Sequence, residues 1–316
     1  MMPAIELINV TKYFPLRGRD KDGRKRVVRA VDGVSLSVEN GRIHAIIGET
    51  GSGKTTVARM ITGLTEPTTG SVRIDDHPLY NPSGTVNAET RKNIQMVFQD
   101  PYSSFNPKFT IARSVAEPLK LHHVRYSLET IASALEMVKL TPPEDFLNRL
   151  PHELSGGQKQ RAAFARAIIM NRRIIVADEP VSMLDASIRA NILKLIMELN
   201  AASSTTFILI SHDISMALMI SDGLTVIYLG KMMEQGSKTQ IRSNPLHPYT
   251  KLLFETVPTL DTREMADASY SDVDASVRIQ GCVFADRCRS AMAVCSETEP
   301  ALKEVDPGHK VACHLY

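Results

Sequence analysis

Tryptophan is absent from this 316-residue sequence, and aromatic residues make up only 5% of it. This composition argues against a surface that stacks carbohydrate rings or recognises antigens as an antibody does. Charge of one sign is not in excess either, because the formal net charge is only +2. Nothing in the overall composition therefore favours nucleic acid as a partner.

Long apolar runs are also missing. A helix needs about 18 to 20 predominantly apolar residues to cross a bilayer, and the richest segment, 214–229, is interrupted by Ser221, Asp222 and Gly223. The N-terminus lacks a basic segment followed by an apolar run, so we expect no signal peptide. Any role at a membrane would therefore depend on docking to a partner protein.

Cysteine does not occur before Cys282, and the other three follow closely as Cys288, Cys295 and Cys313. In a chain without an export signal, such clustering favours a metal or metal-cluster site over a disulfide framework. The remaining composition, with 43% hydrophobic and 23% charged residues, is typical of a globular protein with a buried core. The length suits one large domain with an appendage, or two modest domains.

The pattern of apolar residues predicts an α/β protein. Segments 4–10 and 27–38 have strand character and predict an antiparallel pair. The basic stretch between them, 17–26, could contact nucleic acid or lipid, but a solvent-exposed hairpin loop is favoured. Residues 112–149 have helical spacing and predict an all-helical insert. From 157 to 229 helices and strands alternate, which implies a parallel sheet covered on both faces.

This alternation ends near Gly236, where prolines begin to punctuate a helical segment, and residues 260–278 form a polar linker before the cysteines. We therefore predict one domain over 1–236, which includes a helical subdomain at about 100–170. A smaller extension over 237–316 would carry the four cysteines.

A phosphate-binding loop is the strongest motif. The segment 48–55 lies between an apolar strand and a helical run that begins at Thr56, and it matches G-x-x-x-x-G-K-[ST] in full. Its glycines let successive N–H groups form an anion nest, and the helix N-terminus adds partial positive charge. Lys54 would reach the β- and γ-phosphates, and the Thr55 hydroxyl would ligate magnesium. The whole motif is Gly48, Glu49, Thr50, Gly51, Ser52, Gly53, Lys54 and Thr55.

Two adjacent carboxylates, Asp178 and Glu179, follow a second apolar strand at 174–177. Asp178 would face the magnesium shell, and Glu179 would polarise the attacking water. Many strands end in solvated acids, so this pair alone is weak evidence for a magnesium site. Together with the phosphate-binding loop upstream, it becomes strong evidence.

A second phosphate-ready helix N-terminus is predicted at Ser155, Gly156, Gly157 and Gln158, which precede the helical run 159–170. A serine N-cap followed by flexible glycines is the simpler interpretation of this motif. However, one nucleoside triphosphate does not need two such sites in one chain. The favoured interpretation is a dimer in which each subunit's motif covers the nucleotide held by the other.

With these motifs in this order, the chain resembles the nucleotide-binding subunits of ABC transporters over residues 4–236. The resemblance implies a P-loop NTPase cassette with a RecA-like mixed sheet core, an antiparallel β subdomain and a helical subdomain. It also implies ATP and Mg²⁺ as cofactors, and ATP hydrolysis coupled to solute translocation.

The resemblance assigns roles to four further positions. It implies that Gln99 touches magnesium and the attacking water, that Asp185 communicates across a dimer, and that His212 contacts the γ-phosphate. Phe14 would stack on adenine, with Tyr13 as the alternative. The implied catalytic residues are Glu179, His212, Gln99 and Lys54, and the implied magnesium ligands are Thr55, Gln99 and Asp178.

The tail is similar to the extension carried by importers of dipeptides, oligopeptides and nickel, both over residues 244–253 and in its cysteine pattern C-x5-C-x6-C-x17-C. Subunits of this type can hold a [4Fe–4S] cluster on four such thiolates. Zinc remains an alternative, because soft sulfur ligands suit an iron–sulfur cluster and zinc equally. Reduced, unligated thiols are the third possibility.

We therefore expect the ATP-hydrolysing subunit of an importer of di- or oligopeptides, at the cytoplasmic face of the cell membrane. The implied partners are two transmembrane permease subunits, a second ATP-binding subunit that is identical or related, and, indirectly, an extracytoplasmic solute-binding protein; no nucleic acid is expected. Oligosaccharide and nickel uptake are alternatives. An ABC ATPase of translation or DNA repair is disfavoured by the single cassette, and a purely regulatory protein by the intact catalytic motifs.

Overall fold

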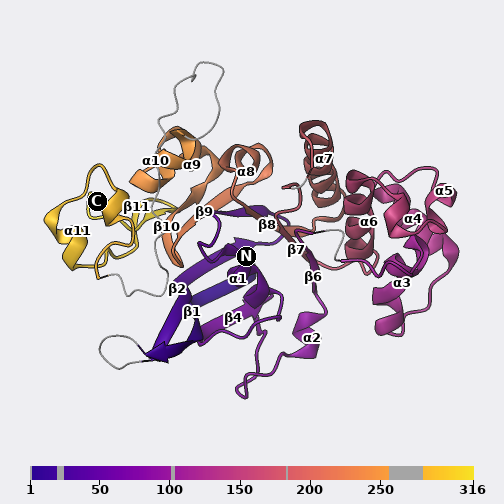
Figure 1. Cartoon of the computed structure of the whole chain (residues 1–316), viewed down its shortest axis with the longest axis horizontal. Coiled ribbons are helices and arrows are strands. Elements are labelled where there is room, and N and C mark those ends of the chain that lie inside the picture. Colours follow the sequence, from indigo (N-terminus) through magenta and orange to yellow (C-terminus); the bar gives the residue numbers. More distant parts are fainter. Residues whose placement is uncertain (1, 20–24, 101–103, 183, 256–279) are drawn as a thin grey trace.

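The computed structural model of the chain describes residues 2–19, 25–100, 104–182, 184–255 and 280–316. Figure 1 shows a central sheet with its helices, a smaller sheet below it, and a group of helices at the right-hand end. The predicted linker at 260–278 lies outside the described residues. Every described helix is too short or too polar to span a lipid bilayer.

The smaller sheet is antiparallel, and its first two strands confirm the predicted pair, with Leu7 opposite Leu36. Alternate residues of these strands, such as Ile5 and Leu7, are fully buried because one face of the sheet packs on the core. In spatial order the strands are β2 (Lys25–Glu39), β1 (Pro3–Arg19), β4 (Thr69–Ile74) and β5 (His77–Pro78).

The central sheet is mixed. Five neighbouring strands from β9 to β6 run parallel, as the alternation of helices and strands predicts, and each of the remaining three pairs antiparallel with its neighbours. In spatial order the strands are β11 (Lys303–Asp306), β12 (His309–Val311), β10 (Lys231–Ser237), β9 (Gly223–Tyr228), β3 (Ile43–Ile47), β8 (Thr206–Ser211), β7 (Ile174–Asp178) and β6 (Ile94–Val97).

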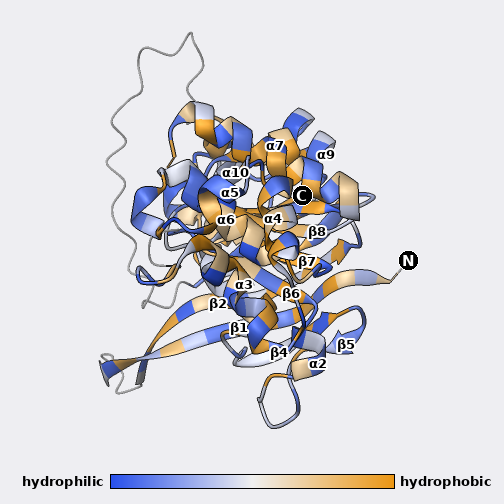
Figure 2. Cartoon of the chain, turned by 90° about the vertical axis from the view of Figure 1, so that its right-hand side faces the viewer, coloured by the Kyte–Doolittle hydropathy of each residue, from blue (hydrophilic) through white to orange (hydrophobic). Residues whose placement is uncertain are grey.

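Helices cover both faces of this sheet, because alternate residues of its strands enter two separate cores. Ile46 and Ile208 pack with helix α1 (Lys54–Ile61) and the antiparallel sheet, whereas Ala45 and Phe207 pack on the opposite side. Figure 2 shows apolar residues along these central strands. The helices of the opposite side are α7 (Ala186–Ser203), α8 (Ile214–Ile220), α9 (Lys238–Ser243) and α10 (Pro248–Glu255).

The insert between β6 and β7 is helical, as predicted for 112–149. Helix α3 buries Ile111 and Val115, and α4 buries Ile131 and Leu135, so that these helices share a core with α6. Its helices are α3 (Ile111–Leu121), α4 (Leu128–Met137), α5 (Glu144–Leu147) and α6 (Gly156–Ile168), and the short α2 (Ala88–Arg91) precedes β6.

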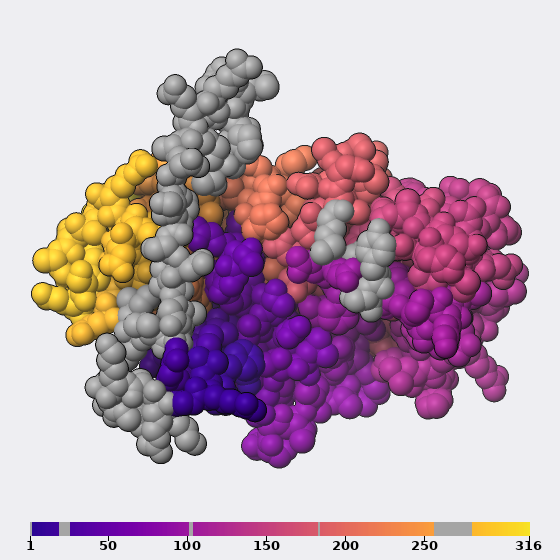
Figure 3. Space-filling model, viewed as in Figure 1, coloured from indigo at the N-terminus to yellow at the C-terminus, as the bar shows by residue number. Residues whose placement is uncertain are grey.

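The C-terminal extension lies at the opposite end of the molecule from this insert (Figure 3). Its strands β11 and β12 continue the central sheet through β10, which the sequence pattern does not predict. The described residues of β11 are all exposed, so the segment lacks the apolar pattern by which a strand is recognised. The predicted boundary between 236 and 237 falls within β10 and stays a prediction.

Candidate functional site

Four of the parallel strands bring the predicted site residues to one edge of the central sheet. The carboxyl ends of neighbouring parallel strands lie at the same edge, which is where α/β proteins bind ligands. The phosphate-binding loop follows β3, Gln99 follows β6, and His212 follows β8. Asp178 and Glu179 lie at the end of β7.

The phosphate-binding loop passes very close to its neighbours. Gly53 has a φ of +102°, and a Cβ there would lie 2.0 Å from the carbonyl oxygen of Ala30. A Cβ on Gly48 would lie 2.1 Å from the carbonyl oxygen of Ile227. Glycine is therefore required at both positions by space. A cavity of about 160 Å³ opens beside the loop and is lined by Val28, Arg29, Ala30, Gly51, Gly53, Lys54, Thr55, Thr56 and Leu229.

Lys54 lies buried inside this loop, where its ammonium donates hydrogen bonds to the carbonyl oxygens of Gly48 and Glu49, each at 2.7 Å. Burial lowers the pKa of Lys54, and the nearby carboxylates of Glu179, Asp178 and Glu49 oppose that shift. The loop thus holds a cationic side chain next to the backbone nest, an arrangement suited to a polyphosphate.

The Thr55 hydroxyl donates a hydrogen bond to the Asp178 carboxylate at 3.2 Å. Burial raises the pKa of Asp178, and the charge of Glu179 adds to that effect, whereas Thr55 and Lys54 lower it. Hard oxygen ligands of this kind, one hydroxyl and one carboxylate, fit Mg²⁺, which retains several waters in its shell. The two residues remain the predicted magnesium ligands.

Glu179 and His212 form a pair, although 33 positions separate them in the chain. The Nδ1 atom of His212 lies 2.8 Å and 3.0 Å from the two Glu179 carboxylate oxygens. Glu179 has the left-handed φ of +48°, which is strained for a non-glycine residue, and its N–H donates to the carbonyl oxygen of Ile210 on β8. The carboxylate is thus aimed and held, as orientation of an attacking water requires.

The second motif begins helix α6. The Ser155 hydroxyl accepts a hydrogen bond from the Gln158 N–H at 3.3 Å, and the Gln158 side chain accepts one from the Ser155 N–H at 2.9 Å. This capping box is the simpler role foreseen for the serine. Among the described residues that line the cavity beside the phosphate-binding loop, none comes from this motif. A role at the nucleotide therefore stays a prediction that requires a second subunit.

The remaining predicted residues lie at exposed positions. Gln99 follows β6, and Asp185 precedes α7 without making a side-chain capping bond to any described residue. The ring of Phe14 is 40% exposed, whereas the hydroxyl of Tyr13 donates a hydrogen bond to Asp32. A cation lies over each ring, with Lys12 Nζ 5.3 Å from the Phe14 centroid and Arg29 Cζ 5.2 Å from that of Tyr13. The roles of all these residues stay predictions.

The four cysteines converge in the extension. Burial raises the pKa of the Cys282 thiol, and the charges of Cys295, Cys313 and Cys288 raise it further, so the four lie within electrostatic reach of one another. In the described part of the chain, however, no group of three or more histidine, cysteine, aspartate or glutamate residues is placed to hold a metal ion. The structure therefore does not support the predicted cluster or the zinc alternative.

Two residues of the extension contact the phosphate-binding loop. Arg287 forms an ion pair with Glu49, and the Tyr249 hydroxyl accepts a hydrogen bond from the Glu49 N–H at 2.9 Å. These contacts join residues separated by at least 200 positions, and no motif in the sequence indicates them. Only the folded chain reveals that the extension contacts the candidate site.

Comparisons with known proteins agree with this geometry. Residues 31–182 match the family described as ABC transporter, and residues 233–295 match the one described as oligopeptide/dipeptide transporter, C-terminal region. The oligopeptide transport ATP-binding protein AppF of Bacillus subtilis (strain 168) is 42% identical, over 99% of this chain and 97% of AppF. The dipeptide transport ATP-binding protein DppF of Escherichia coli (strain K12) is 36% identical, over 98% of this chain and 94% of DppF.

Solved structures share the fold. The dimeric structure of MJ0796, a bacterial ABC transporter cassette, has a TM-score of 0.64 and 30% identity, and the match covers 74% of this chain and 98% of that one. The structure of cbiO1 from Clostridium perfringens, part of the ABC transporter complex cbiONQ, has a TM-score of 0.64 at 24% identity, and the match covers 77% of this chain and 92% of that one. The predicted cassette fold is thereby confirmed, and with it the predicted membership: the chain belongs to the ATP-binding proteins of ABC transporters, in the group that carries the oligopeptide/dipeptide transporter C-terminal region.

Proposed function

We propose that this chain powers an importer of dipeptides or oligopeptides from the cytoplasmic face of the cell membrane. The convergence of Lys54, the Thr55–Asp178 pair and the Glu179–His212 pair at one sheet edge carries this proposal. Peptide as the solute is supported by relatives that are named for oligopeptide or dipeptide transport. Neither oligosaccharide nor nickel uptake has comparable support in the relatives described above.

Each site residue has a proposed task. The N–H groups of the loop and Lys54 bind the phosphates, while Thr55, Asp178 and Gln99 supply oxygen ligands to magnesium. Magnesium, when bound, neutralises charge on the β- and γ-phosphates. Glu179 orients the attacking water, His212 contacts the γ-phosphate and also fixes the Glu179 carboxylate, and Phe14 stacks on adenine.

We also propose that a second ATP-binding subunit, identical or related, completes the site. Ser155 is exposed at the N-terminus of α6, where its helix can donate N–H groups to phosphate oxygens of a nucleotide bound elsewhere. The dimeric structure of MJ0796 supports such a pairing. Asp185, exposed in the loop after β7, would contact the facing subunit.

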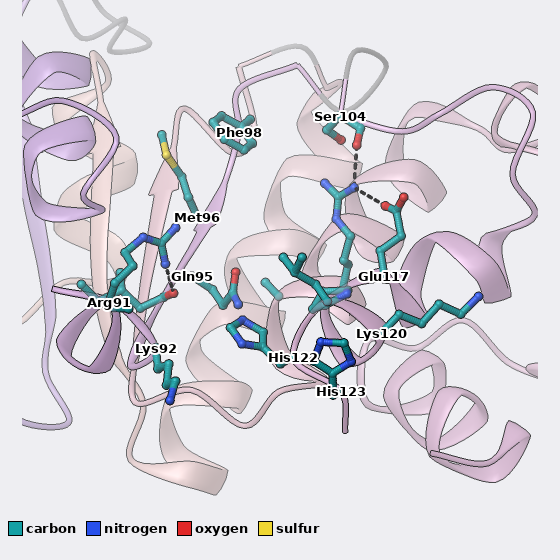
Figure 4. Close-up of a pocket in the computed structure, with 16 residues that line it drawn as sticks. Arg91, Lys92, Gln95, Met96, Phe98, Ser104, Glu117, Lys120, His122 and His123 are labelled. Atoms are coloured by element: carbon teal, nitrogen blue, oxygen red, sulfur yellow. Dashed lines mark hydrogen bonds and ion pairs between the residues drawn. The ribbon is translucent and has the colours of Figure 1, made fainter. Parts of the chain in front are cut away.

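A groove of about 1290 Å³ is proposed to dock a short helix of a membrane subunit (Figure 4). Among the described residues that line the groove, cationic side chains outnumber the one acid, Glu117, so the partner helix should carry acidic residues. Exposed apolar side chains, Phe98 at 40% and Leu121 at 77%, offer contact area as well. The groove lies between α2 with β6 and helices α3 and α6, and its cations are Arg91, Lys92, Lys120 and Arg166, with His122 and His123 beside them.

Leu121→Ser should weaken the association with the membrane subunits by about tenfold, because an exposed apolar anchor in a groove is lost. The purified complex of wild-type protein, permeases and binding protein should show ATP turnover that rises when peptide is added. The variant should lose this stimulation while it keeps the basal turnover of the isolated chain. Leu128→Ser is the matched control, because Leu128 is 67% exposed on the same insert but does not line the groove. Equal behaviour of the two variants would contradict the docking site, and no response to peptide would contradict the proposed cargo.

The cysteines are proposed as the ligands of a [4Fe–4S] cluster, with Zn²⁺ as the alternative. Their gathering in the extension supports a shared site, but as the described residues stand the thiols are not arranged to hold a metal ion and would have to rearrange. Protein purified without oxygen should contain iron and sulfide, and Cys295→Ser should lose both while the chain still folds. Metal-free protein that cannot be reconstituted with iron and sulfide, or with zinc, would refute this assignment.

A further inference from the structure

The extension holds one residue of the phosphate-binding loop, Glu49, on several sides. Its carboxylate accepts two parallel hydrogen bonds from the Arg287 guanidinium, each at 2.8 Å. Its N–H donates to the Tyr249 hydroxyl at 2.9 Å, and its carbonyl oxygen accepts from Lys54 at 2.7 Å. Both the backbone and the side chain of this residue are therefore fixed.

The two residues that bind Glu49, Tyr249 and Arg287, are themselves fixed by aromatic packing and hydrogen bonding. Tyr249 is fully buried on α10, and its ring centroid lies 4.7 Å from that of Tyr228 and 5.3 Å from that of Phe284. Arg287 donates a further hydrogen bond to the Tyr228 hydroxyl at 3.1 Å. Because Tyr228 ends the parallel strand β9, this aromatic group ties the extension to the strand layer that carries the loop.

Glu49 places a negative charge in the loop predicted to bind polyphosphate. This charge acts electrostatically on the buried Lys54, because Glu49 is one of three carboxylates that raise the pKa of Lys54. An unpaired carboxylate there would repel the phosphates. A bidentate arginine offsets the charge and also fixes where the carboxylate points. The Arg287 side chain is 15% exposed and the Glu49 side chain 41%, so solvent reaches the pair mainly from the Glu49 side and screens it in part.

We propose that Arg287 is a positioning residue for nucleotide binding, by which the C-terminal extension neutralises and aims Glu49 in the phosphate-binding loop. This inference rests on the proposed ATP-binding role of the loop. Arg287 does not touch the nucleotide, and it acts through Glu49. The extension is thus a working part of the nucleotide site as well as an addition to the central sheet.

Binding of a fluorescent ATP analogue to the full-length chain tests this proposal. Arg287→Ala should raise the Kd about tenfold, which corresponds to about 1.4 kcal/mol. In the complex with permeases it should raise the KM for ATP by a similar factor while kcat changes little. Arg289→Ala is the matched control and should leave the Kd unchanged, because Arg289 lies two positions away, 87% exposed, and pairs with Glu255 instead.

A second pair of variants separates charge neutralisation from a general loss of structure. Glu49→Gln removes the charge that Arg287 offsets, so the double variant Glu49→Gln/Arg287→Ala should regain a Kd within about threefold of wild type. Arg287→Lys, which keeps the charge but loses the two parallel bonds, should fall between wild type and Arg287→Ala. A double variant as weak as Arg287→Ala, or a Kd that Arg287→Ala does not change, would overturn the inference alone. Failure of the wild-type chain to bind ATP would overturn the proposed function as well.

Discussion

ATP turnover at least 100-fold slower than that of the wild-type protein is the expected result of replacing Glu179 by glutamine. Proton transfer and water orientation by a side chain contribute about 10²- to 10⁴-fold to a reaction rate. An amide keeps the size of the carboxylate but loses its basicity. The hydrogen bonds of Lys54 and of the Thr55–Asp178 pair do not involve Glu179, so the affinity for ATP should persist. The measurements are phosphate release and equilibrium binding of ATP.

The same variant should accumulate as an ATP-bound dimer, visible by size-exclusion chromatography, because closure no longer leads to hydrolysis. Glu136→Gln, at an exposed position of the helical insert, is the matched control and should turn over ATP at the wild-type rate. Turnover above half the wild-type rate in Glu179→Gln would rule out Glu179 as the residue that orients water.

Gly53→Ala should cost about 3 kcal/mol or more of unfolding free energy and abolish measurable ATP binding. The new methyl group would lie 2.0 Å from the Ala30 carbonyl oxygen, and a backbone atom in strand β2 cannot give way as a flexible side chain can. The loop or the strand must therefore shift, and the nest of N–H groups shifts with it. Urea unfolding and ATP titration measure the two effects.

Gly51→Ala is the control that separates the steric clash with Ala30 from the penalty of a left-handed backbone. Gly51 also has a positive φ, +81°, but a Cβ there would meet no described atom within 4 Å. Only the left-handed backbone penalty applies, at about 1–2 kcal/mol. Equal losses in the two variants would show that backbone strain, and not the approach of Ala30, explains the glycine at position 53.

The cassette could be predicted from patterns of residues that are close together in the sequence. A glycine-rich loop between an apolar strand and a helix, and an apolar strand that ends in Asp178 and Glu179, are each encoded within a few consecutive residues. The same holds for the helical insert, whose spacing of apolar residues is visible without any partner segment. Such features depend on neighbouring residues in the chain, so a single sequence shows them.

Features that depend on distant segments were missed or left open. Strands β11 and β12 are short and mostly polar, and β12 lies beside β10 through backbone pairing with Glu234 and Gln235 and through the buried contact between His309 and Glu234. The groove between α2 and α3 depends on how the insert packs against β6. Convergence of the cysteines could be expected from their spacing, but the positions of their thiols could not.

The sequence by itself determined which residues bear the chemistry, because phosphate binding and water activation need particular side chains at short, fixed spacings. Only the tertiary structure decided that Glu179 faces His212 and that the extension contacts the phosphate-binding loop through Arg287 and Tyr249. Those contacts arise when strand order and aromatic packing bring together segments that lie far apart in the chain. No local pattern records that geometry, because it is a property of the packed chain as a whole.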